Sequence, residues 1–454
     1  MSKDHSVYLE ERYGRNLPLA AAAFAKRVLR SRVAGVLKEK SSNCQSEPYT
    51  EQKDLLTGPS TRGVAEVAVD DVYLYPTGMA AIWNAHNLAL AVLPPAKSIC
   101  FGLVLRYVLR SIAWPSLVDR FPYTDTLKIL QKWGPGCHFL GLGIDTDVDK
   151  LEIFLQEEFN RNPADPPILA LFTEFPSNPL LRSANLPRLR ALADKYDFLI
   201  IIDETIGNFV NVEVLPYADV VVSSLSKIFS GASNVMGGRY RFLFYLVSGL
   251  SGSLLILDSL VLNPQGRHYQ ALKKYMDDSF EDFYFDEDAI YMERNSRDFK
   301  QRIRIIDSNA EAVCDLLRQR SLVGGASSPA IKEVFYPKYI TPENYNHCRI
   351  KNIASSSDGK AGGYGGLFSL TFTSLPASIA FFDTLPCYKG PSLGTNFTLA
   401  CPYTILAHFA ELDWAAEFGV EEGLVRISVG MEDTDVLLRS FEMALAAAEA
   451  IISS

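Results

Sequence analysis

The chain has 454 residues, enough for two or three domains with sizeable cores. Its formal net charge of −9 at pH 7 argues against a nucleic-acid partner, and the sequence shows no basic stripe. The seven cysteines form no CxxC pair, so neither a zinc site nor a disulfide framework is indicated, and no metal-ligand cluster is expected among the six histidines. The first 16 residues are polar and acidic, unlike a secretory signal, so we expect a cytoplasmic protein with reduced thiols.

Residues 1–65 are expected to form an N-terminal arm. Within it, residues 17–37 are rich in alanine and arginine, which favours a helix. Residues 41–62 are polar and rich in turn formers, which predicts a loop.

Strands and helices are predicted to alternate after the arm. The strands are expected at residues 72–74, 98–102, 168–172, 198–202 and 218–222, and the helices at residues 80–93 and 186–196. Such alternation implies an α/β fold, in which a mostly parallel sheet carries helices on both faces. We therefore expect residues 66–292 to form one large domain.

Residues 293–320 read as one long amphipathic helix. It is expected to link the large domain to a smaller C-terminal α+β domain, the two together spanning residues 293–454. The smaller domain should hold strands at residues 367–372 and 424–429, and a Ser/Gly-rich loop at residues 355–366. The apolar face of the helix comprises Phe299, Ile303, Ile306, Ala310 and Leu317.

An acid and a lysine follow two consecutive predicted strands. Asp203 ends the strand at 198–202, and Ser224-Leu225-Ser226-Lys227 follows the strand at 218–222. Ligands of open α/β sheets bind at this edge. A lysine flanked by two hydroxyls, with an acid nearby, suits pyridoxal phosphate, because the lysine forms a Schiff base, the acid holds the pyridinium nitrogen and the hydroxyls donate to phosphate. Taken alone, however, Asp203 could be an ordinary strand end and Lys227 a surface lysine.

Two apolar, arginine-containing segments interrupt this organisation, at residues 103–120 and 239–258. The second is shorter than the roughly 20 apolar residues that a comfortable bilayer span needs, so no membrane partner is expected. Insertions usually enter as polar loops, and we interpret both segments as translated introns. The alternatives are a substrate lid for the first, and a buried helix, a membrane-surface element or a subunit contact for the second.

Taken together, the motifs resemble those of the Cys/Met metabolism (trans-sulfuration) family of pyridoxal-phosphate enzymes, especially fungal cystathionine γ-synthase-like proteins. The resemblance covers nearly the whole chain outside the two segments. It implies the aspartate-aminotransferase-like fold (fold type I), with a mostly parallel seven-stranded sheet in the large domain and a smaller C-terminal α+β domain. It also implies pyridoxal phosphate as the cofactor.

The resemblance assigns expected cofactor contacts. Pro76-Thr77-Gly78-Met79 looks like the phosphate-binding turn, where backbone N–H groups at a helix N-terminus face the phosphate. The stretch Glu174 to Pro179 is similar to the family's acid-x-Pro-x-Asn-Pro loop, whose Asn lies beside the cofactor's ring oxygen. The expected contacts are Gly78, Met79, Asn178, Asp203, Thr205, Ser224, Ser226 and Lys227.

Three aromatic and arginine residues extend this set. Tyr123 matches the aromatic that stacks on the cofactor ring and shuttles a proton, although it could also be plain core. Tyr13-Gly14-Arg15 resembles the Tyr-x-Arg of the arm that reaches the neighbouring subunit's phosphate. The resemblance therefore implies a homodimer or a homotetramer.

The resemblance also assigns a substrate side. Arg426 matches the arginine that binds the substrate carboxylate, although it could be a structural ion-pair partner. Ser392 lies in the loop that resembles the family's substrate loop. Phe397 stands where bacterial members usually carry an acid, so the substrate contacts differ there.

The implied reaction is a γ-substitution on an O-acylated homoserine, with Lys227 and Tyr123 as the catalytic residues. The nucleophile could be cysteine, sulfide or a carbon nucleophile, in methionine or trans-sulfuration metabolism or in fungal secondary metabolism. A γ- or β-lyase is the alternative reaction. The second alternative is that the protein is a relative of these enzymes without catalytic activity.

Overall fold

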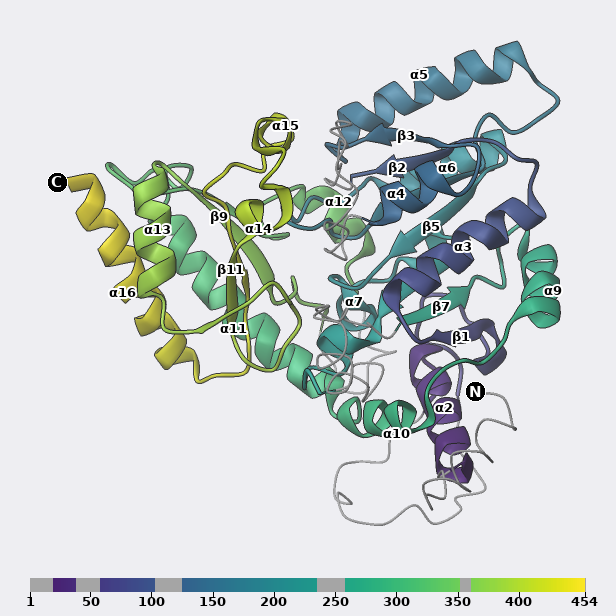
Figure 1. Ribbon diagram of the computed structural model, residues 1–454, viewed down its shortest axis with the longest axis horizontal. Helices are drawn as coiled ribbons and strands as arrows, with labels where there is room; N and C mark the ends of the chain where they lie inside the picture. The colour runs from purple at the N-terminus through teal and green to yellow at the C-terminus, as the bar shows by residue number, and fades with distance from the viewer. Residues whose placement is uncertain (1–18, 38–57, 103–124, 235–257, 352–360, 454) are drawn as a thin grey trace, which may run out of the picture.

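The computed structural model describes residues 19–37, 58–102, 125–234, 258–351 and 361–453, and shows two domains (Figure 1). Three of the predicted site residues, Tyr13, Arg15 and Tyr123, lie outside the described residues. So do the first apolar segment and residues 239–257 of the second.

The large domain is built on a seven-stranded sheet. Strand β7 runs antiparallel to both of its neighbours, β1 and β6, whereas the pairs β6–β5, β5–β4, β4–β2 and β2–β3 are parallel. The prediction of a mostly parallel seven-stranded sheet is therefore confirmed. In spatial order the strands are β1 (Val72–Tyr75), β7 (Asp258–Leu262), β6 (Val220–Ser224), β5 (Leu199–Asp203), β4 (Ala170–Glu174), β2 (Ser98–Phe101) and β3 (Cys137–Leu140).

Helices cover both faces of this sheet, which is why the central strands are continuous apolar runs rather than alternating ones. On one face the core contains side chains of α3, α4 and α9, and on the other face side chains of α2, α5, α6 and α10. These helices are α2 (Leu19–Val33), α3 (Gly78–Val92), α4 (Asp125–Lys132), α5 (Asp145–Arg161), α6 (Leu186–Tyr196), α9 (Tyr269–Ser279) and α10 (Asp286–Asn295); a further short helix is α7 (Asn208–Asn211). Within the described ranges, no helix is both long and apolar enough to span a bilayer.

The single helix predicted over residues 293–320 is wrong. Helix α10 ends at Asn295, and a new helix, α11 (Phe299–Gln319), begins after three intervening residues. Between them, the Ser296 hydroxyl donates to the Met292 carbonyl (2.8 Å) and accepts from Arg32 of α2 (2.7 Å). Because of this break, α10 packs against α2 while α11 runs on into the small domain (Figure 1). The predicted apolar face of α11 is buried, as expected.

The small domain contains a five-stranded sheet, which packs against α11. Its spatial order is β10 (Tyr388–Lys389), β11 (Leu399–Pro402), β12 (Val425–Ser428), β9 (Leu367–Phe372) and β8 (Ile331–Phe335), and only the β10–β11 pair is parallel. Strand β9 has the predicted bounds and β12 begins and ends one residue inside them. The helices of this domain are α12 (Pro342–Cys348), α13 (Leu375–Thr384), α14 (Tyr403–His408), α15 (Leu412–Glu417) and α16 (Thr434–Ser453).

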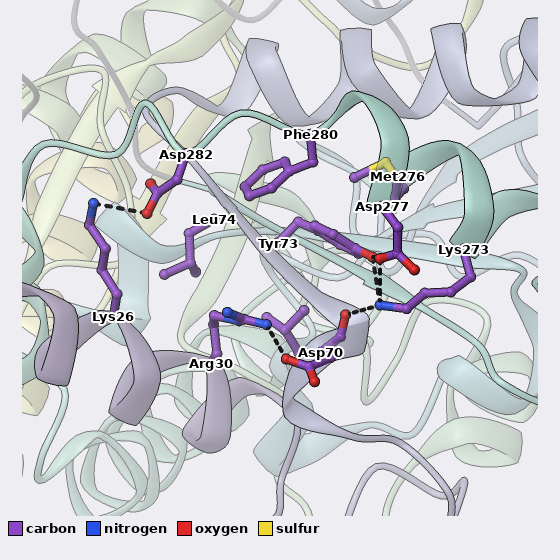
Figure 2. Close-up of a pocket in the computed structure, with 11 residues that line it drawn as sticks. Lys26, Arg30, Asp70, Tyr73, Leu74, Lys273, Met276, Asp277, Phe280 and Asp282 are labelled. Carbon is purple, nitrogen blue, oxygen red and sulfur yellow. Dashed lines mark hydrogen bonds and ion pairs between the residues drawn. The ribbon is translucent and has the colours of Figure 1, made fainter. Parts of the chain in front are cut away.

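A hollow of about 380 Å³ lies between α2, β1 and α9 (Figure 2). Its charged side chains are paired with one another: Lys26 lies 3.0 Å from Asp282, and Arg30 lies 2.8 Å from Asp70. Lys273 donates to the Asp70 carbonyl and to the Tyr73 hydroxyl. We call this region the α2–α9 hollow.

Candidate active site

Lys227 lies at the carboxyl edge of the large sheet, in a short turn (Leu225–Phe229) that directly follows β6 and kinks at Lys227, whose φ of −82° and ψ of −129° are not helical. The side chain is buried, and its Nζ lies 3.3 Å from the Ser392 Oγ of the small domain. This approach depends on Gly394, whose φ is +72° and where a Cβ would lie 2.6 Å from the Ile228 nitrogen. A side chain at 394 would therefore push the Ser392 loop away from the lysine.

Burial and, to a smaller extent, the Arg426 guanidinium lower the pKa of Lys227, whereas Asp258 raises it, and together these effects bring the pKa to about 7. A lysine with such a pKa has a substantial unprotonated fraction near neutrality, which is the nucleophilic form. The surface-lysine interpretation of Lys227 is therefore wrong.

Three carboxyl groups lie at the same edge of the sheet, one of them buried (Asp258) and two partly buried (Asp203 and Glu174). Asp203 closes β5 and lies directly opposite Glu174, which closes β4. Asp258 opens β7, which reaches this edge with its first residue because it runs antiparallel, and it lies opposite Ser224. Burial raises the pKa of all three, and the pKa of Glu174, which Asp203 also raises, reaches about 8. Asp258 belongs to the segment predicted to be an insertion, and its Oδ1 is buried without a hydrogen-bond partner in the described structure.

The predicted cofactor contacts converge around this edge. The hydroxyls of Ser224 and Ser226 lie 3.3 Å apart, and the Ser224 backbone N–H donates to the Thr205 hydroxyl (2.8 Å). Thr205 in turn donates its backbone N–H to Asp203 Oδ1 (2.9 Å), which holds the carboxylate in place. The sequence motifs alone did not show this chain of contacts from acid to hydroxyl.

Gly78 and Met79 form the first turn of α3, which packs against β6 and β7. Thr77 caps this helix by accepting from the Ala80 N–H (2.9 Å). The first N–H groups of a helix have no partner within the helix, so this turn can take an anion such as a phosphate. A lysine amine, a carboxylate, two hydroxyls and a helix N-terminus together fit the aldehyde, ring nitrogen and phosphate of pyridoxal phosphate.

On the small-domain side, Arg426 of β12 reaches across to the large domain. Its Nη1 donates to the Asn178 Oδ1 (2.9 Å), and its Nη2 donates to the carbonyls of Pro391 (2.5 Å) and Ser392 (3.4 Å). Among the described residues, no carboxylate lies within salt-bridge distance of Arg426, so the structural ion-pair interpretation is not supported there. The structure thus brings Lys227, Asn178, Ser392 and Arg426 together from four separate segments.

Two residues of this neighbourhood were missed by the sequence reasoning. The ring of Tyr403 faces the Arg426 guanidinium at 4.8 Å, and Gly394 packs on Lys227. The only signal for Gly394 was its place in the Ser-Leu-Gly-Thr stretch, and Tyr403 had none. Phe397, where the substrate contacts were expected to differ from those of bacterial members, packs edge-to-face on Tyr388 with ring centroids 4.9 Å apart.

Comparison with known proteins places the chain in a family. Residues 143–242 match the family model described as Cys/Met metabolism PLP-dependent enzyme. The cystathionine gamma-synthase-like enzyme iboG2 of Amanita muscaria is 60% identical over 450 residues, which cover 98% of this chain and 65% of iboG2. The cystathionine gamma-synthase-like enzyme iboG1 of the same species is 57% identical over 455 residues, which cover 99% of this chain and 68% of iboG1. The chain belongs to the Cys/Met metabolism family.

The Cys/Met metabolism family consists of PLP-dependent enzymes, whose cofactor is pyridoxal phosphate. The cystathionine gamma synthase of Xanthomonas oryzae pv. oryzae, solved in complex with cystathionine, has the same fold. The match has a TM-score of 0.59 and 20% sequence identity, and covers 95% of this chain and 98% of that one. The predicted family, fold class and cofactor are therefore confirmed. The chain spans 65% of the length of iboG2, so the activity of the whole protein remains a matter for proposal.

Proposed function

We propose that the enzyme catalyses a γ-substitution on an O-acylated homoserine. In this reaction the Cγ–O bond breaks, the acyl group leaves as a carboxylate, and a bond from Cγ to the incoming nucleophile forms as the nucleophile loses its proton. The observation that carries the proposal is the pairing of Lys227 with Ser392 at 3.3 Å, beside a buried Arg426 that is held by neutral groups. The names of the two Amanita relatives support the same reaction class.

The proposed cofactor side consists of residues at the carboxyl edge of the large sheet. Lys227 attaches the cofactor covalently, and Asp203 holds the pyridinium proton. Thr205 positions Asp203, and Asn178 lies beside the ring oxygen. The proposed phosphate contacts are Gly78, Met79, Ser224 and Ser226, with Tyr13 and Arg15 supplied by the neighbouring subunit of a homodimer or homotetramer.

Pyridoxal phosphate, when bound, supplies an electron sink that stabilises the negative charge left on carbon after proton removal. Lys227, once released by the incoming amino acid, moves the proton at Cα, a task suited to a group with a pKa near the working pH. Arg426 and Ser392 hold the α-carboxylate, so that the Cα–H bond has a fixed orientation. Tyr123 stays a prediction as the stacking aromatic and proton shuttle.

The proposed nucleophile is a thiol, cysteine or sulfide, with a carbon nucleophile as the alternative. Incubation of the holoenzyme with O-acetylhomoserine, with and without cysteine, tests the proposal. We expect cystathionine and acetate in the presence of cysteine, and their loss in the Arg426→Lys variant. Formation of 2-oxobutanoate alone, unaffected by any added nucleophile, would show a lyase instead.

We further propose that residues 103–120 and 239–257 are translated introns and not part of the working enzyme. The predicted second segment ended at Asp258, but this residue is the first of β7 and pairs with Tyr75 and Ser224, so it is kept. Removal of the two segments joins Gly102 to Phe121 and Gly238 to Asp258. Sequencing of the mature transcript tests this. If both segments are present in the message, and the full-length chain turns over faster than the doubly deleted one, the segments are functional elements.

A further inference from the structure

Tyr403 occupies a position between the two domains beside the proposed substrate site. It begins α14 directly after β11, and its side chain is buried in a small apolar cluster with Leu180, Val420 and Leu424. Its backbone N–H donates to the Leu424 carbonyl (3.0 Å), and its ring lies 5.9 Å from the His408 ring. Packing on these sides leaves the ring little freedom to turn.

The Arg426 guanidinium lies over the ring of Tyr403, with 4.8 Å between the guanidinium carbon and the ring centroid. The other partners of Arg426 hold its edges: Asn178 binds Nη1, and the carbonyls of Pro391 and Ser392 bind Nη2. A guanidinium that is held only at its Nη atoms can still tilt out of its plane. The tyrosine ring removes this freedom, and a two-point contact with a carboxylate depends on the plane of the guanidinium.

The hydroxyl of Tyr403 extends the contact to the large domain. The Asn178 Nδ2 donates to it at 3.4 Å, while the Asn178 Oδ1 accepts from Arg426. Burial raises the pKa of Tyr403, so the hydroxyl stays protonated and uncharged at neutral pH. Tyr403, Asn178 and Arg426 thus form a closed triangle across the domain boundary.

We propose that Tyr403 is a positioning residue of the substrate site, which orients the Arg426 guanidinium for the α-carboxylate of the amino-acid substrate. This inference rests on the proposed role of Arg426 in carboxylate binding. If the inference is right, loss of the Tyr403 ring weakens binding of the substrate carboxylate and leaves the other contacts of the substrate unchanged.

The test compares two ligands that differ only in the carboxylate, L-homoserine and 3-aminopropan-1-ol. Each is titrated against the holoenzyme, and binding is followed by the visible absorption of the bound cofactor. Tyr403→Leu removes the ring, Tyr403→Phe keeps the ring and removes the hydroxyl, and Arg426→Lys serves as the reference for loss of the carboxylate contact. If the leucine variant does not accumulate as folded protein, Tyr403→Met replaces it, because methionine has a long unbranched side chain without a ring.

We expect Tyr403→Leu to weaken L-homoserine binding about tenfold, from the loss of a buried cation–π contact. Binding of 3-aminopropan-1-ol should stay within about twofold of wild type, and Tyr403→Phe should weaken L-homoserine by about threefold or less because the 3.4 Å hydrogen bond is long. In turnover of O-acetylhomoserine, KM should rise more than kcat falls.

Equal weakening of both ligands by Tyr403→Leu, or no change in either, would overturn the inference. The reference variant separates this result from a failure of the proposed function. If Arg426→Lys weakens L-homoserine selectively and Tyr403→Leu does not, only the role of Tyr403 is wrong. If Arg426→Lys leaves both ligands unchanged, the carboxylate site lies elsewhere, and the inference fails together with the proposed substrate placement.

Discussion

Two regions of the large domain gather lysine, arginine and carboxylate side chains, and they differ in how these groups are solvated. In the α2–α9 hollow, Lys26 and Arg30 form ion pairs of 3.0 Å and 2.8 Å with Asp282 and Asp70, whose side chains are 47% and 83% exposed (Figure 2). At the carboxyl edge of the sheet, desolvation lowers the pKa of the buried Lys227 and raises the pKa of the partly buried Asp203.

The difference shows that a cluster of charges does not by itself mark a functional site. Exposed ion pairs satisfy their charges in water and contribute little to stability. Buried groups with shifted pKa values cost folding free energy, and they cluster where chemistry needs them. We therefore expect substitutions in the two regions to have different consequences.

The largest effect is expected for Lys227→Ala. It should abolish the covalent attachment of pyridoxal phosphate and lower turnover by at least about a thousandfold, because the nucleophilic amine is lost. Lys26→Ala, in the α2–α9 hollow, should keep both. Borohydride reduction of the holoenzyme followed by peptide mapping locates the linkage, and a label on any other lysine would contradict the assignment.

Breaking the buried ion pair between Arg62 and Glu204 should strongly lower the stability of the fold. Glu204 is the residue next to Asp203. The two side chains lie 2.6 Å apart and are only 2% and 1% exposed. Arg62→Met leaves Glu204 buried without its cation, so the free energy of unfolding should fall by about 3–5 kcal/mol. Arg30→Met, which breaks the exposed pair with Asp70, should cost less than about 1 kcal/mol.

Urea denaturation of both variants measures this difference. Similar losses for Arg62→Met and Arg30→Met would mean that burial does not distinguish the two ion pairs. In that case the contrast between the two regions would be confined to Lys227 and its immediate neighbours.

The two aspartates of the edge, Asp203 and Asp258, should respond differently to replacement by asparagine. Asp203→Asn should lower turnover about a hundredfold, since it removes the charge that stabilises a proton on the cofactor ring. Asp258→Asn should change turnover by less than about threefold, because burial already favours the protonated form of Asp258, which the amide resembles in shape and charge. Both effects are measured from turnover and from the position of the visible absorption band. Equal losses of turnover in the two variants would show that Asp203 does not hold a proton on the cofactor ring.

The smallest expected effect is the dependence of the rate of cofactor attachment on pH. Cofactor attachment to the apoprotein needs the unprotonated amine of Lys227, whose pKa is lowered from 10.5 to about 7. The attachment rate should therefore rise with pH up to about 7 and level off above it, being about tenfold slower at pH 6 than at pH 8. A rate that continues to rise towards pH 10 would show that the lysine is not desolvated in the apoprotein.

Sequence patterns predicted the α/β architecture, and the family resemblance implied the fold type. The predicted strands lie within two residues of their observed places. The strand predicted at 198–202, for example, is β5, which ends at Asp203. Such strands can be recognised because burial on both faces requires a continuous apolar run. The order of strands and helices also implied that Asp203 and Lys227 meet at one edge, and the two residues do lie there. The half-buried edge strand β3 and the antiparallel strand β7 were not predicted. Strand β3 is a short run of four residues, and β7 directly follows the second apolar segment.

Only the tertiary structure decided which side chains complete the site. The break between α10 and α11 depends on the contact of Ser296 with Arg32, more than 260 residues away in the chain. The positions of Gly394 and Tyr403 depend on how the small domain packs against the large one, and the third carboxyl of the edge, Asp258, reaches it only because β7 runs antiparallel. Periodicity reports which face of an element is buried, whereas contacts between distant segments depend on the packing of the whole chain, and no local pattern records them.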